Sequence, residues 1–344
     1  MYTWLRNGLF LLPPEMAHDV ALNALSAGRF VGLPRLVGGC PRSAPVELMG
    51  LSFPNPVGLA AGLDKNGDHI YALGQLGFGF VEVGTVTPRP QPGNPKPRMF
   101  RLPEHQALIN RLGFNNKGVD HLVDRLKSTR YDGIIGANIG KQKDTPVDEA
   151  AADYRFCLEK VHPHCHYITV NISSPNTANL RELQDTGHLR EFLDELVRAR
   201  NSLDESNETC RPLLIKIAPD WEPAALTASL EVIATSGIDG LITTNTTLDR
   251  TRVAGHAHAD EAGGLSGAPV KSLADATLRR AREVLGTDFP IIGLGGITRG
   301  EDAADKRRCG ADLVQIYTGF IYQGPRLVHD CIRAWQTVDE DTAA

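Results

Sequence analysis

The chain has 344 residues, of which 42% are hydrophobic and 22% are charged, and its formal net charge is −5. This composition is typical of a globular protein and excludes a disordered or fibrous chain. The acidic balance argues against a nucleic-acid partner, which normally meets a basic surface. The six cysteines include no Cys-x-x-Cys pair, so we expect no iron–sulfur cluster, no structural zinc and no disulfide scaffold.

Residues 1–43 predict an apolar, helical N-terminal extension interrupted by prolines. Between residues 15 and 25 the apolar positions follow the i, i+3/i+4 rhythm of an amphipathic helix. No apolar run reaches the roughly 18 residues that a membrane-spanning helix needs, and Arg6 and Asn7 interrupt the first stretch, unlike a secretory signal. We therefore expect a soluble chain or one that lies on a membrane surface.

Residues 44–344 alternate short apolar strands with helical segments and predict one catalytic domain. A small hairpin is expected first, at 46–48 and 51–53. Eight further strands are predicted at 57–59, 80–83, 134–138, 168–171, 213–217, 240–243, 291–293 and 313–316, and helical patterns such as 147–160, 189–203 and 223–235 separate them. Eight strand–helix units of this size predict a (β/α)8 TIM barrel. An open, doubly wound sheet is the alternative, because a strand count from one sequence is uncertain.

Polar side chains follow every predicted barrel strand. The carboxyl ends of barrel strands meet at one face, where barrel enzymes place their chemistry. We therefore expect a site built from Asp64, Lys65, Thr85, Asn138, Lys141, Asn171, Ser174, Lys216, Thr244, Asn245, Thr246, Tyr317 and Thr318.

Glycine-rich turns follow the last two predicted strands, at residues 293–297 and 317–319. Glycines let backbone N–H groups approach phosphate oxygens. Two tight turns are the alternative interpretation, but the position after strands seven and eight favours a phosphate site. The segment 264–267 would supply a third backbone contact.

Lysine, asparagine and serine side chains suggest what else the site binds. Lys216 lies between isoleucines in a strand expected to be buried, where an ammonium needs an anionic partner unless it snorkels to the surface. Asparagine amides suit a ring with alternating N–H and C=O groups; turn formation is the alternative and fits Asn115 and Asn116 well. Ser174 has no hydrolase motif around it, and by spacing alone it is a turn residue. Thr177 could assist it as a proton relay.

Two histidine groups have weaker signals. His162, His164 and His166 could bind a metal, but they precede a strand and so lie on the opposite face of the barrel, where structural histidines are the better interpretation. We predict no metal site. His256 and His258 lie in a long loop, residues 248–262, that could form a lid.

Several long motifs resemble class 2 dihydroorotate dehydrogenases, the quinone-linked flavoenzymes of pyrimidine synthesis, over essentially the whole chain. The matching segments are 58–65, 84–88, 110–116, 171–177, 216–220, 243–247 and 315–317. Class 1 enzymes share the barrel but have cysteine as the base. The serine at position 174 and the N-terminal extension both favour class 2.

The resemblance implies oxidation of (S)-dihydroorotate to orotate, in UMP biosynthesis, with FMN in the barrel mouth. The residues that would hold FMN are Ala61, Gly62, Leu63, Asp64, Lys65, Thr85, Asn138, Asn171, Lys216, Thr244, Gly267, Gly296, Tyr317 and Thr318. Thr318 stands where some family members have serine, and its hydroxyl can make the same hydrogen bond. The orotate pocket would use Lys65, Asn110, Arg111, Leu112, Gly113, Phe114, Asn171, Asn176, Asn245 and Thr246.

The mechanism that the resemblance implies assigns a role to each charged or reactive group. Ser174 would remove the C5 proton of dihydroorotate, Thr177 and a water would carry it away, and a hydride would pass from C6 to flavin N5. Lys216 would offset charge on the flavin N1–C2 carbonyl, and Lys65 would hold the substrate carboxylate. A membrane quinone, ubiquinone or menaquinone, would then be reduced.

The resemblance also gives residues 1–43 a purpose: they would rest on the membrane and form an apolar quinone tunnel lined by His18, Arg101 and Tyr317. For His18 a partly buried helix histidine is the alternative. We expect a monomer, peripheral on the cytoplasmic side of a bacterial inner membrane. Competing hypotheses are a soluble enzyme that uses fumarate or NAD, and an inactive flavin-binding or membrane-binding module.

Overall fold

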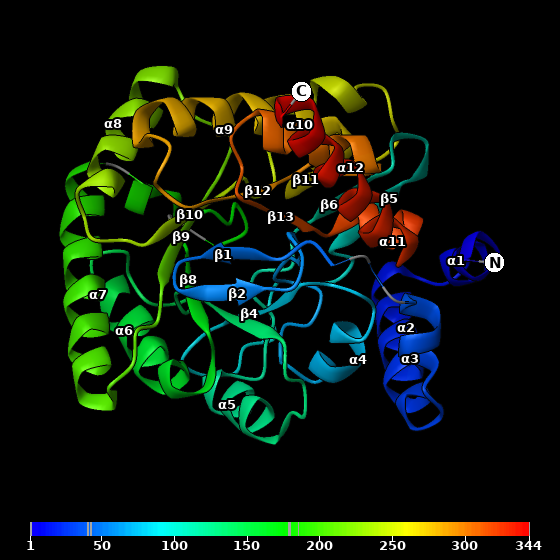
Figure 1. Ribbon diagram of the computed structural model, residues 1–344, viewed down its shortest axis with the longest axis horizontal. Coiled ribbons are helices and arrows are strands. Elements are labelled where there is room, and N and C mark those ends of the chain that lie inside the picture. Colours follow the sequence, from blue (N-terminus) through cyan, green and yellow to red (C-terminus); the bar gives the residue numbers. More distant parts are fainter. Residues whose placement is uncertain (1, 40, 42, 178–179, 185, 344) are drawn as a thin grey trace.

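Eight parallel strands close into a barrel within the part of the chain that the structure describes (Figure 1). The computed structural model describes residues 2–343 except 40, 42, 178–179 and 185, so residues 1, 40 and 42 of the predicted extension lie outside it. The barrel strands are β3 (Val57–Leu59), β4 (Phe80–Val86), β7 (Ile134–Ile139), β8 (Tyr167–Asn171), β9 (Leu213–Ile217), β10 (Gly240–Thr243), β12 (Ile291–Leu294) and β13 (Leu313–Ile316). Because β13 pairs with β3, the predicted TIM barrel is confirmed and the open sheet is excluded.

Helices surround the barrel. They are α4 (Ile70–Gly74), α5 (Val119–Ser128), α6 (Ala150–Val161), α7 (Thr186–Asn207), α8 (Pro223–Ala234), α9 (Lys271–Leu285), α10 (Gly300–Arg308), α11 (Thr318–Gln323) and α12 (Arg326–Ala343). In α5 the buried residues are Val119, Leu122, Val123 and Leu126, which is the i, i+3, i+4, i+7 pattern of a helix packed on one face. The strands between these helices are buried almost throughout, so their continuous apolar runs predicted strands correctly.

The predicted hairpin closes the N-terminal end of the barrel. Strands β1 (Val46–Leu48) and β2 (Leu51–Phe53) pair antiparallel. Phe53 packs edge-on against Phe80, with ring centroids 5.2 Å apart, in a core that also contains Tyr167. With this end filled, the opposite end of the strands is left for the site.

A three-stranded antiparallel sheet beside the barrel was missed by the sequence analysis. It consists of β5 (Met99–Leu102), β6 (Ala107–Asn110) and β11 (Gly264–Gly267), with β6 in the middle. Strand β11 has the sequence Gly-Leu-Ser-Gly, and glycine is depleted in strands, so it read as a loop. The loop at 248–262 packs on this sheet through Val253 and Ala259.

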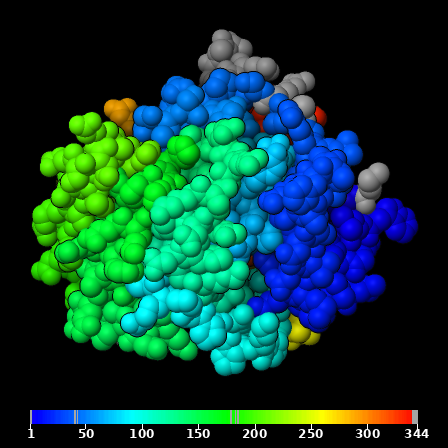
Figure 2. All heavy atoms as spheres, turned by 90° about the horizontal axis from the view of Figure 1, so that it is seen from below, coloured from blue at the N-terminus to red at the C-terminus, as the bar shows by residue number. Residues whose placement is uncertain are grey.

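The N-terminal extension lies on one flank of the barrel, beside α11 and away from α6 and α7 (Figures 1 and 2). It contains α1 (Tyr2–Phe10), α2 (Pro14–Ala27), a 3₁₀ turn at Gly28–Val31 and α3 (Leu33–Gly38). Few of its apolar side chains are buried, and the exposed ones include Trp4, Leu5, Leu11, Met16, Val20, Phe30, Val31, Leu33, Leu36 and Val37. Among the described residues, no helix is long and apolar enough to cross a membrane.

Candidate active site

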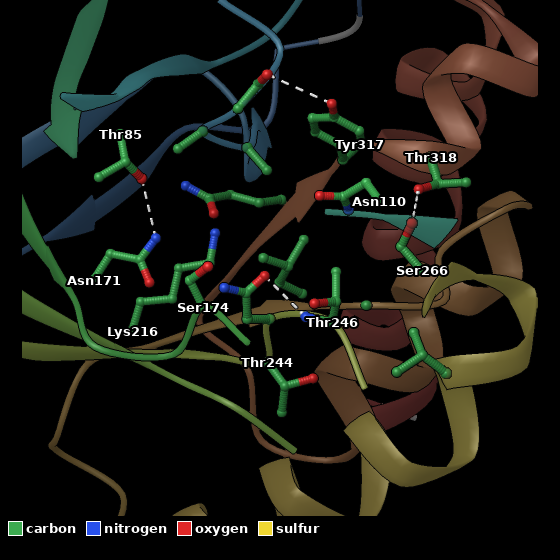
Figure 3. Close-up of a pocket in the computed structure, with 18 of the residues that line it drawn as sticks. Thr85, Asn110, Asn171, Ser174, Lys216, Thr244, Thr246, Ser266, Tyr317 and Thr318 are labelled. Carbon is green, nitrogen blue, oxygen red and sulfur yellow. Dashed lines mark hydrogen bonds between the residues drawn. The ribbon is translucent and has the colours of Figure 1, made fainter. Parts of the chain in front are cut away.

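A cavity opens at the carboxyl ends of the barrel strands and gathers most of the predicted site residues (Figure 3). Its walls come from the barrel, from β6 and β11 of the side sheet, and from the loop after β8. The predicted residues that line it are Ala61, Gly62, Lys65, Thr85, Asn110, Leu112, Gly113, Phe114, Asn171, Ser174, Asn176, Lys216, Thr244, Asn245, Thr246, Gly267, Gly296, Tyr317 and Thr318.

Other predicted residues lie behind or beside this lining. Asp64 is buried and accepts the backbone N–H groups of Asp68 and His69, at 3.0 and 2.7 Å, while burial raises its pKa. Asn138 lies beneath the cavity floor, where it accepts a hydrogen bond from the Thr85 hydroxyl. Leu63 and Thr177 are buried outside the lining. Arg111 turns outward to Glu261, 2.6 Å away, so it orders the cavity rim.

One end of the cavity is a glycine cradle suited to a phosphate. Gly295 and Gly296 have φ values of 100° and 81°, and a Cβ on Gly296 would lie 2.3 Å from the Lys271 Cα. Thr318 donates to the Ser266 hydroxyl at 2.8 Å. The buried hydroxyl of Thr244, which lines the cavity, has no hydrogen-bond partner among the described residues. An unsatisfied donor beside exposed backbone fits an anionic ligand.

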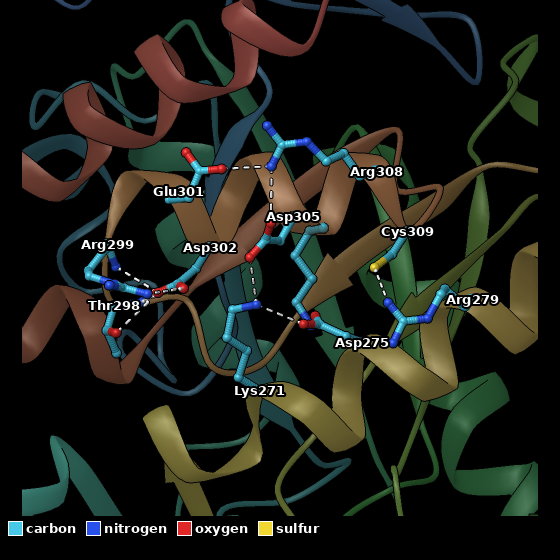
Figure 4. Close-up of polar contacts among 11 residues, drawn as sticks. Lys271, Asp275, Arg279, Thr298, Arg299, Glu301, Asp302, Asp305, Arg308 and Cys309 are labelled. Atoms are coloured by element: carbon cyan, nitrogen blue, oxygen red, sulfur yellow. Dashed lines mark hydrogen bonds and ion pairs between the residues drawn. The ribbon is translucent and has the colours of Figure 1, made fainter.

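A network of charged side chains fixes the helices behind this cradle (Figure 4). Lys271 on α9 contacts Asp275 at 2.8 Å and Asp305 of α10 at 2.9 Å. Lys306, fully buried, lies 2.8 Å from Asp275 on its other side, and burial lowers the pKa of this lysine. The network therefore joins α9 to α10 directly behind the Gly293–Gly296 turn.

Two lysines supply positive charge to the cavity. Burial lowers the pKa of Lys65 to about 8, although the nearby carboxylate of Glu15 opposes the shift. Lys216 is buried, which lowers its pKa, while the charge of Glu82 acts in the opposite direction. Because the cavity wall offers these two ammonium groups, it suits a ligand that carries or develops negative charge.

Ser174 lies in the loop after β8 and is only 6% exposed. Its hydroxyl oxygen accepts the backbone N–H of Asn176 at 3.2 Å. The neighbouring Ser173 donates to the Asn171 side chain at 2.8 Å. These contacts aim the Ser174 hydroxyl into the cavity and place one N–H beside its oxygen, where negative charge on that oxygen would be stabilised.

The three residues predicted to line a quinone tunnel lie in different places. His18 faces a second, polar cavity between α2 and the barrel, which shares Lys65 with the main cavity; burial and then the Lys65 charge lower its pKa to about 3. Arg101 donates to the carbonyls of Phe10 and Leu12 at 3.1 and 2.8 Å. Tyr317 lines the main cavity. Neither of these two cavities is lined by all three residues.

Several lining residues were absent from the sequence prediction, chiefly Gln315, whereas Ser266 lies in the predicted segment 264–267. Gln315 donates to the carboxylate of Glu82 at 2.7 Å, and its own buried carbonyl has no partner among the described residues. Both Gln315 and Glu82 are polar residues inside otherwise apolar strands. That signal, which identified Lys216, would have found them too.

The histidines outside the site have structural partners. His162 is buried and lies 2.8 Å from Asp204. His166 accepts the backbone N–H of Ile135 at 3.0 Å, and His258 packs on Phe100 with ring centroids 5.2 Å apart. Within the described ranges no cluster of three or more potential ligands could hold a metal ion.

Comparison with known proteins gives concordant matches along the chain. The family model described as Dihydroorotate dehydrogenase matches residues 43–338. A protein of Marinobacter nauticus named dihydroorotate dehydrogenase (quinone) is 52% identical over 334 residues, covering 97% of this chain and 98% of the relative. The protein of that name from Azotobacter vinelandii is 54% identical and covers 97% and 96%.

Solved structures agree with the sequence relatives. The crystal structure of DHODH in complex with ferulenol from Eimeria tenella is 35% identical, with a TM-score of 0.85 over 96% of this chain and 92% of that one. The ligand-free form from the same organism gives a TM-score of 0.84 at the same identity, over 96% of both chains.

Proposed function

Because this chain belongs to the dihydroorotate dehydrogenase family, we propose that it oxidises (S)-dihydroorotate to orotate with FMN as its bound redox group and a membrane quinone as electron acceptor. The observation that carries the proposal is the cavity in which Ser174, Lys65 and Lys216 meet the glycine cradle, in a chain that is 52% identical to a quinone-dependent relative. The reaction is an oxidoreduction in pyrimidine biosynthesis.

The cavity suits FMN because it offers a site for each part of the molecule. The glycine cradle and the hydroxyls of Thr244 and Thr318 would hold the phosphate, and Lys216 would lie against the polar edge of the ring. When bound, FMN would supply the hydride acceptor for substrate oxidation and the two-electron donor for the quinone. The residues of this chain would orient the substrate against the flavin, exclude water from the cavity and move the substrate proton.

Lys65 and four amide groups would bind the substrate. The Lys65 ammonium would pair with the carboxylate of dihydroorotate, which is the only fixed charge on that molecule. The amides that line the cavity offer donors and acceptors that match its ring N–H and C=O groups: Asn110, Asn171, Asn176 and Asn245. The site would reject ring compounds that lack these N–H and C=O groups, because the buried amides would then be left without hydrogen-bond partners.

Ser174 would remove the C5 proton. A serine hydroxyl is a poor base in water, but the backbone N–H of Asn176, 3.2 Å from its oxygen, would stabilise negative charge on it. The proton would leave by way of Thr177, which is buried in the same loop.

The extension would bring the barrel to the quinone. Its exposed apolar side chains, Trp4 at 83% and Phe30 at 81% among them, suit the interface of a bilayer. We propose that the protein is a monomer. We also propose that it lies on the cytoplasmic side of a bacterial inner membrane, because its anionic substrate does not cross a bilayer unaided. Residues 1–43 would then act as the membrane contact and 44–344 as the catalytic domain, with His18, Arg101 and Tyr317 nearest the quinone.

One set of measurements tests this proposal. The purified protein should be yellow, should release FMN on denaturation, and should bleach when dihydroorotate is added without oxygen. Steady-state assays should show turnover with decylubiquinone or a menaquinone analogue and none with fumarate or NAD. Bleaching followed by turnover with fumarate alone would refute the quinone assignment, and a colourless protein would refute FMN.

A further inference from the structure

Gln91 is a buried amide directly behind one wall of the main cavity. It lies outside the cavity lining, yet its side-chain NH₂ group donates to two carbonyl oxygens of that wall, at 3.1 Å to Gly113 and 3.0 Å to Phe114. Its side-chain oxygen accepts the backbone N–H of Lys143 at 3.1 Å and the side-chain amide of Gln142 at 2.9 Å. Because a backbone N–H can only donate, the Gln91 oxygen is fixed towards Lys143 and its NH₂ group towards the wall.

The wall segment turns its N–H groups towards the cavity. The N–H and the C=O of a planar trans peptide point in opposite directions, so a Gly113 carbonyl that faces Gln91 leaves the Phe114 N–H on the side where the wall lines the cavity. The backbone N–H groups of residues 112–115 have no acceptor in the part of the chain that the structure describes. Since buried N–H groups are normally paired, this row of donors suits an acceptor on the ligand.

The backbone of this wall segment is strained at Phe114. Its φ is 49°, and that of the preceding Gly113 is 69°. Glycine adopts such left-handed values readily, whereas a residue with a Cβ does not. A flip of the peptide between these two residues would return Phe114 to an extended φ and would turn the Gly113 carbonyl into the cavity. Among the described residues Gln91 alone donates to that carbonyl, so its NH₂ group opposes the flip.

The peptides on either side of this one have donors besides Gln91. The Phe114 carbonyl also accepts from the Asn116 side chain at 2.7 Å. The Leu112 carbonyl accepts the backbone N–H of Asn94 at 3.0 Å. Both carbonyls would keep a donor if the Gln91 amide were lost, so only the peptide between them depends on that amide.

We propose that Gln91 is a positioning residue for substrate binding: its side-chain amide holds the peptide between Gly113 and Phe114 with the N–H group, and not the carbonyl, towards the substrate. The inference rests on the proposed function, because the acceptor for that N–H is the carboxylate of dihydroorotate or orotate, for which Lys65 lies in the same cavity. A flipped peptide would present a carbonyl oxygen to this carboxylate and repel it. Gln91 therefore acts on affinity and not on the proton acceptor, Ser174.

The test is the holoenzyme with Gln91→Met, which nearly preserves the size of the side chain and removes both donors. Orotate, titrated by the change in flavin absorbance, should bind about tenfold more weakly or worse, because a hydrogen bond to a charged group is lost. In anaerobic stopped-flow bleaching the Kd of dihydroorotate should rise by the same factor. The limiting rate at saturation should stay within about threefold of wild type, since binding is lost without loss of the chemical step. FMN content should be unchanged.

Gln142→Met is the matched control, because Gln142 is as buried as Gln91, 7% against 9% exposed. It also accepts a backbone N–H, that of Arg89, at 3.1 Å, but it donates to Gln91 and not to the cavity wall. In this variant the Lys143 N–H still fixes the Gln91 oxygen, so orotate affinity should stay within about threefold of wild type. Equal weakening of orotate binding in both variants would indicate a general loosening of the loops and would overturn the inference.

Two outcomes separate this inference from the proposed function. Unchanged orotate affinity in a folded Gln91→Met flavoprotein would overturn the positioning role and leave the proposed function intact. A wild-type protein that contains no FMN, or whose flavin dihydroorotate does not bleach, would instead overturn the proposed function.

If Gln91→Met does not accumulate as a folded flavoprotein, hydrogen exchange of the wild-type holoenzyme decides. Exchange of the backbone N–H groups at residues 112–115 should slow about tenfold or more when orotate is added, because these donors then gain an acceptor. Exchange that orotate leaves unchanged at these residues would show that the peptide held by Gln91 does not serve the substrate, and the inference would be wrong.

Discussion

Arg181 and Asp220 form a salt bridge of 2.9 Å between the loop that carries Ser174 and the loop after β9. The same guanidinium donates to the carbonyl oxygens of Ser173 at 3.3 Å and Thr246 at 3.2 Å. One side chain thus connects three segments at the cavity rim. We expect this ion pair to act mainly by positioning the loop that carries Ser174, because surface ion pairs contribute little stability.

Arg181→Ala should therefore impair the chemical step more than flavin binding. A misplaced reacting group costs on the order of 10- to 100-fold in rate, and we expect anaerobic bleaching by dihydroorotate to slow by that factor. Stopped-flow absorbance measures it, with FMN content unchanged. Arg190→Ala, a surface arginine on α7 that donates to Thr235, is the control. Equal slowing in both variants would refute this role of the Arg181–Asp220 pair.

Ser174→Ala should nearly abolish bleaching while FMN and orotate still bind. General-base catalysis contributes roughly 10²- to 10⁴-fold, and alanine removes the proton acceptor without filling the cavity. Ser174→Cys should recover part of the rate, because a thiolate is a competent base. Near-wild-type bleaching in the alanine variant would mean that another group takes the proton.

The pH dependence of substrate binding should report Lys65. Its pKa is lowered to about 8, so the free enzyme loses the ammonium as the pH rises through that value. The carboxylate of dihydroorotate binds the charged form, so kcat/KM should fall about tenfold per pH unit above pH 8. The break in kcat should lie higher, because the bound carboxylate stabilises the ammonium.

Lys65→Arg checks that assignment, since a guanidinium stays charged throughout. In this variant the decline of kcat/KM above pH 8 should disappear, even if the absolute rate is lower. A decline that persists unchanged would mean that a different group titrates.

The buried pair behind the phosphate cradle gives a prediction about stability. Asp275→Asn leaves the fully buried Lys306 without its carboxylate, which should cost about 3–5 kcal/mol in the free energy of unfolding. Asp275→Leu combined with Lys306→Met should recover most of that loss. Urea unfolding measures both.

Asp305→Asn is the control for this prediction, because Asp305 lies at the exposed end of the same network, with a side chain that is 37% exposed. Its loss should cost about 1 kcal/mol or less. A larger effect from Asp305 than from Asp275 would contradict the importance of burial here.

The extension should be needed for quinone reduction and not for substrate oxidation. Replacing Trp4, Leu11 and Phe30 by serine in the full chain removes three exposed apolar groups, and should weaken binding to lipid vesicles about 100-fold. Anaerobic bleaching should stay within about threefold of wild type, because none of the three residues lines the cavity. Deletion of residues 1–43 should show the same split; equal loss of both half-reactions would make the extension a folding element.

The barrel strands were predictable because they are buried on both sides and therefore read as continuous apolar runs. The side sheet was not, since β11 has glycine at both ends and gains its strand character only by pairing with β6. By its spacing in the sequence, Ser174 resembled a turn residue. The structure agrees, because the backbone N–H of Asn176, two residues later, donates to the Ser174 hydroxyl oxygen across the turn. The Arg181–Asp220 pair spans 39 residues, and no local pattern reveals such a contact.

Helix α1 docks on α11 through an edge-on contact between the rings of Phe10 and Tyr322, with centroids 5.5 Å apart, and through main-chain atoms of its partner. The Tyr2 hydroxyl donates to the carbonyl of Ile321 at 2.7 Å, and Arg6 donates to that of Tyr322 at 3.0 Å. Every amino acid offers a carbonyl at those positions. Evolutionary drift on the two sides of these hydrogen bonds is therefore unequal: a substitution of Ile321 keeps the carbonyl that Tyr2 binds, whereas a substitution of Tyr2 or Arg6 removes the donor.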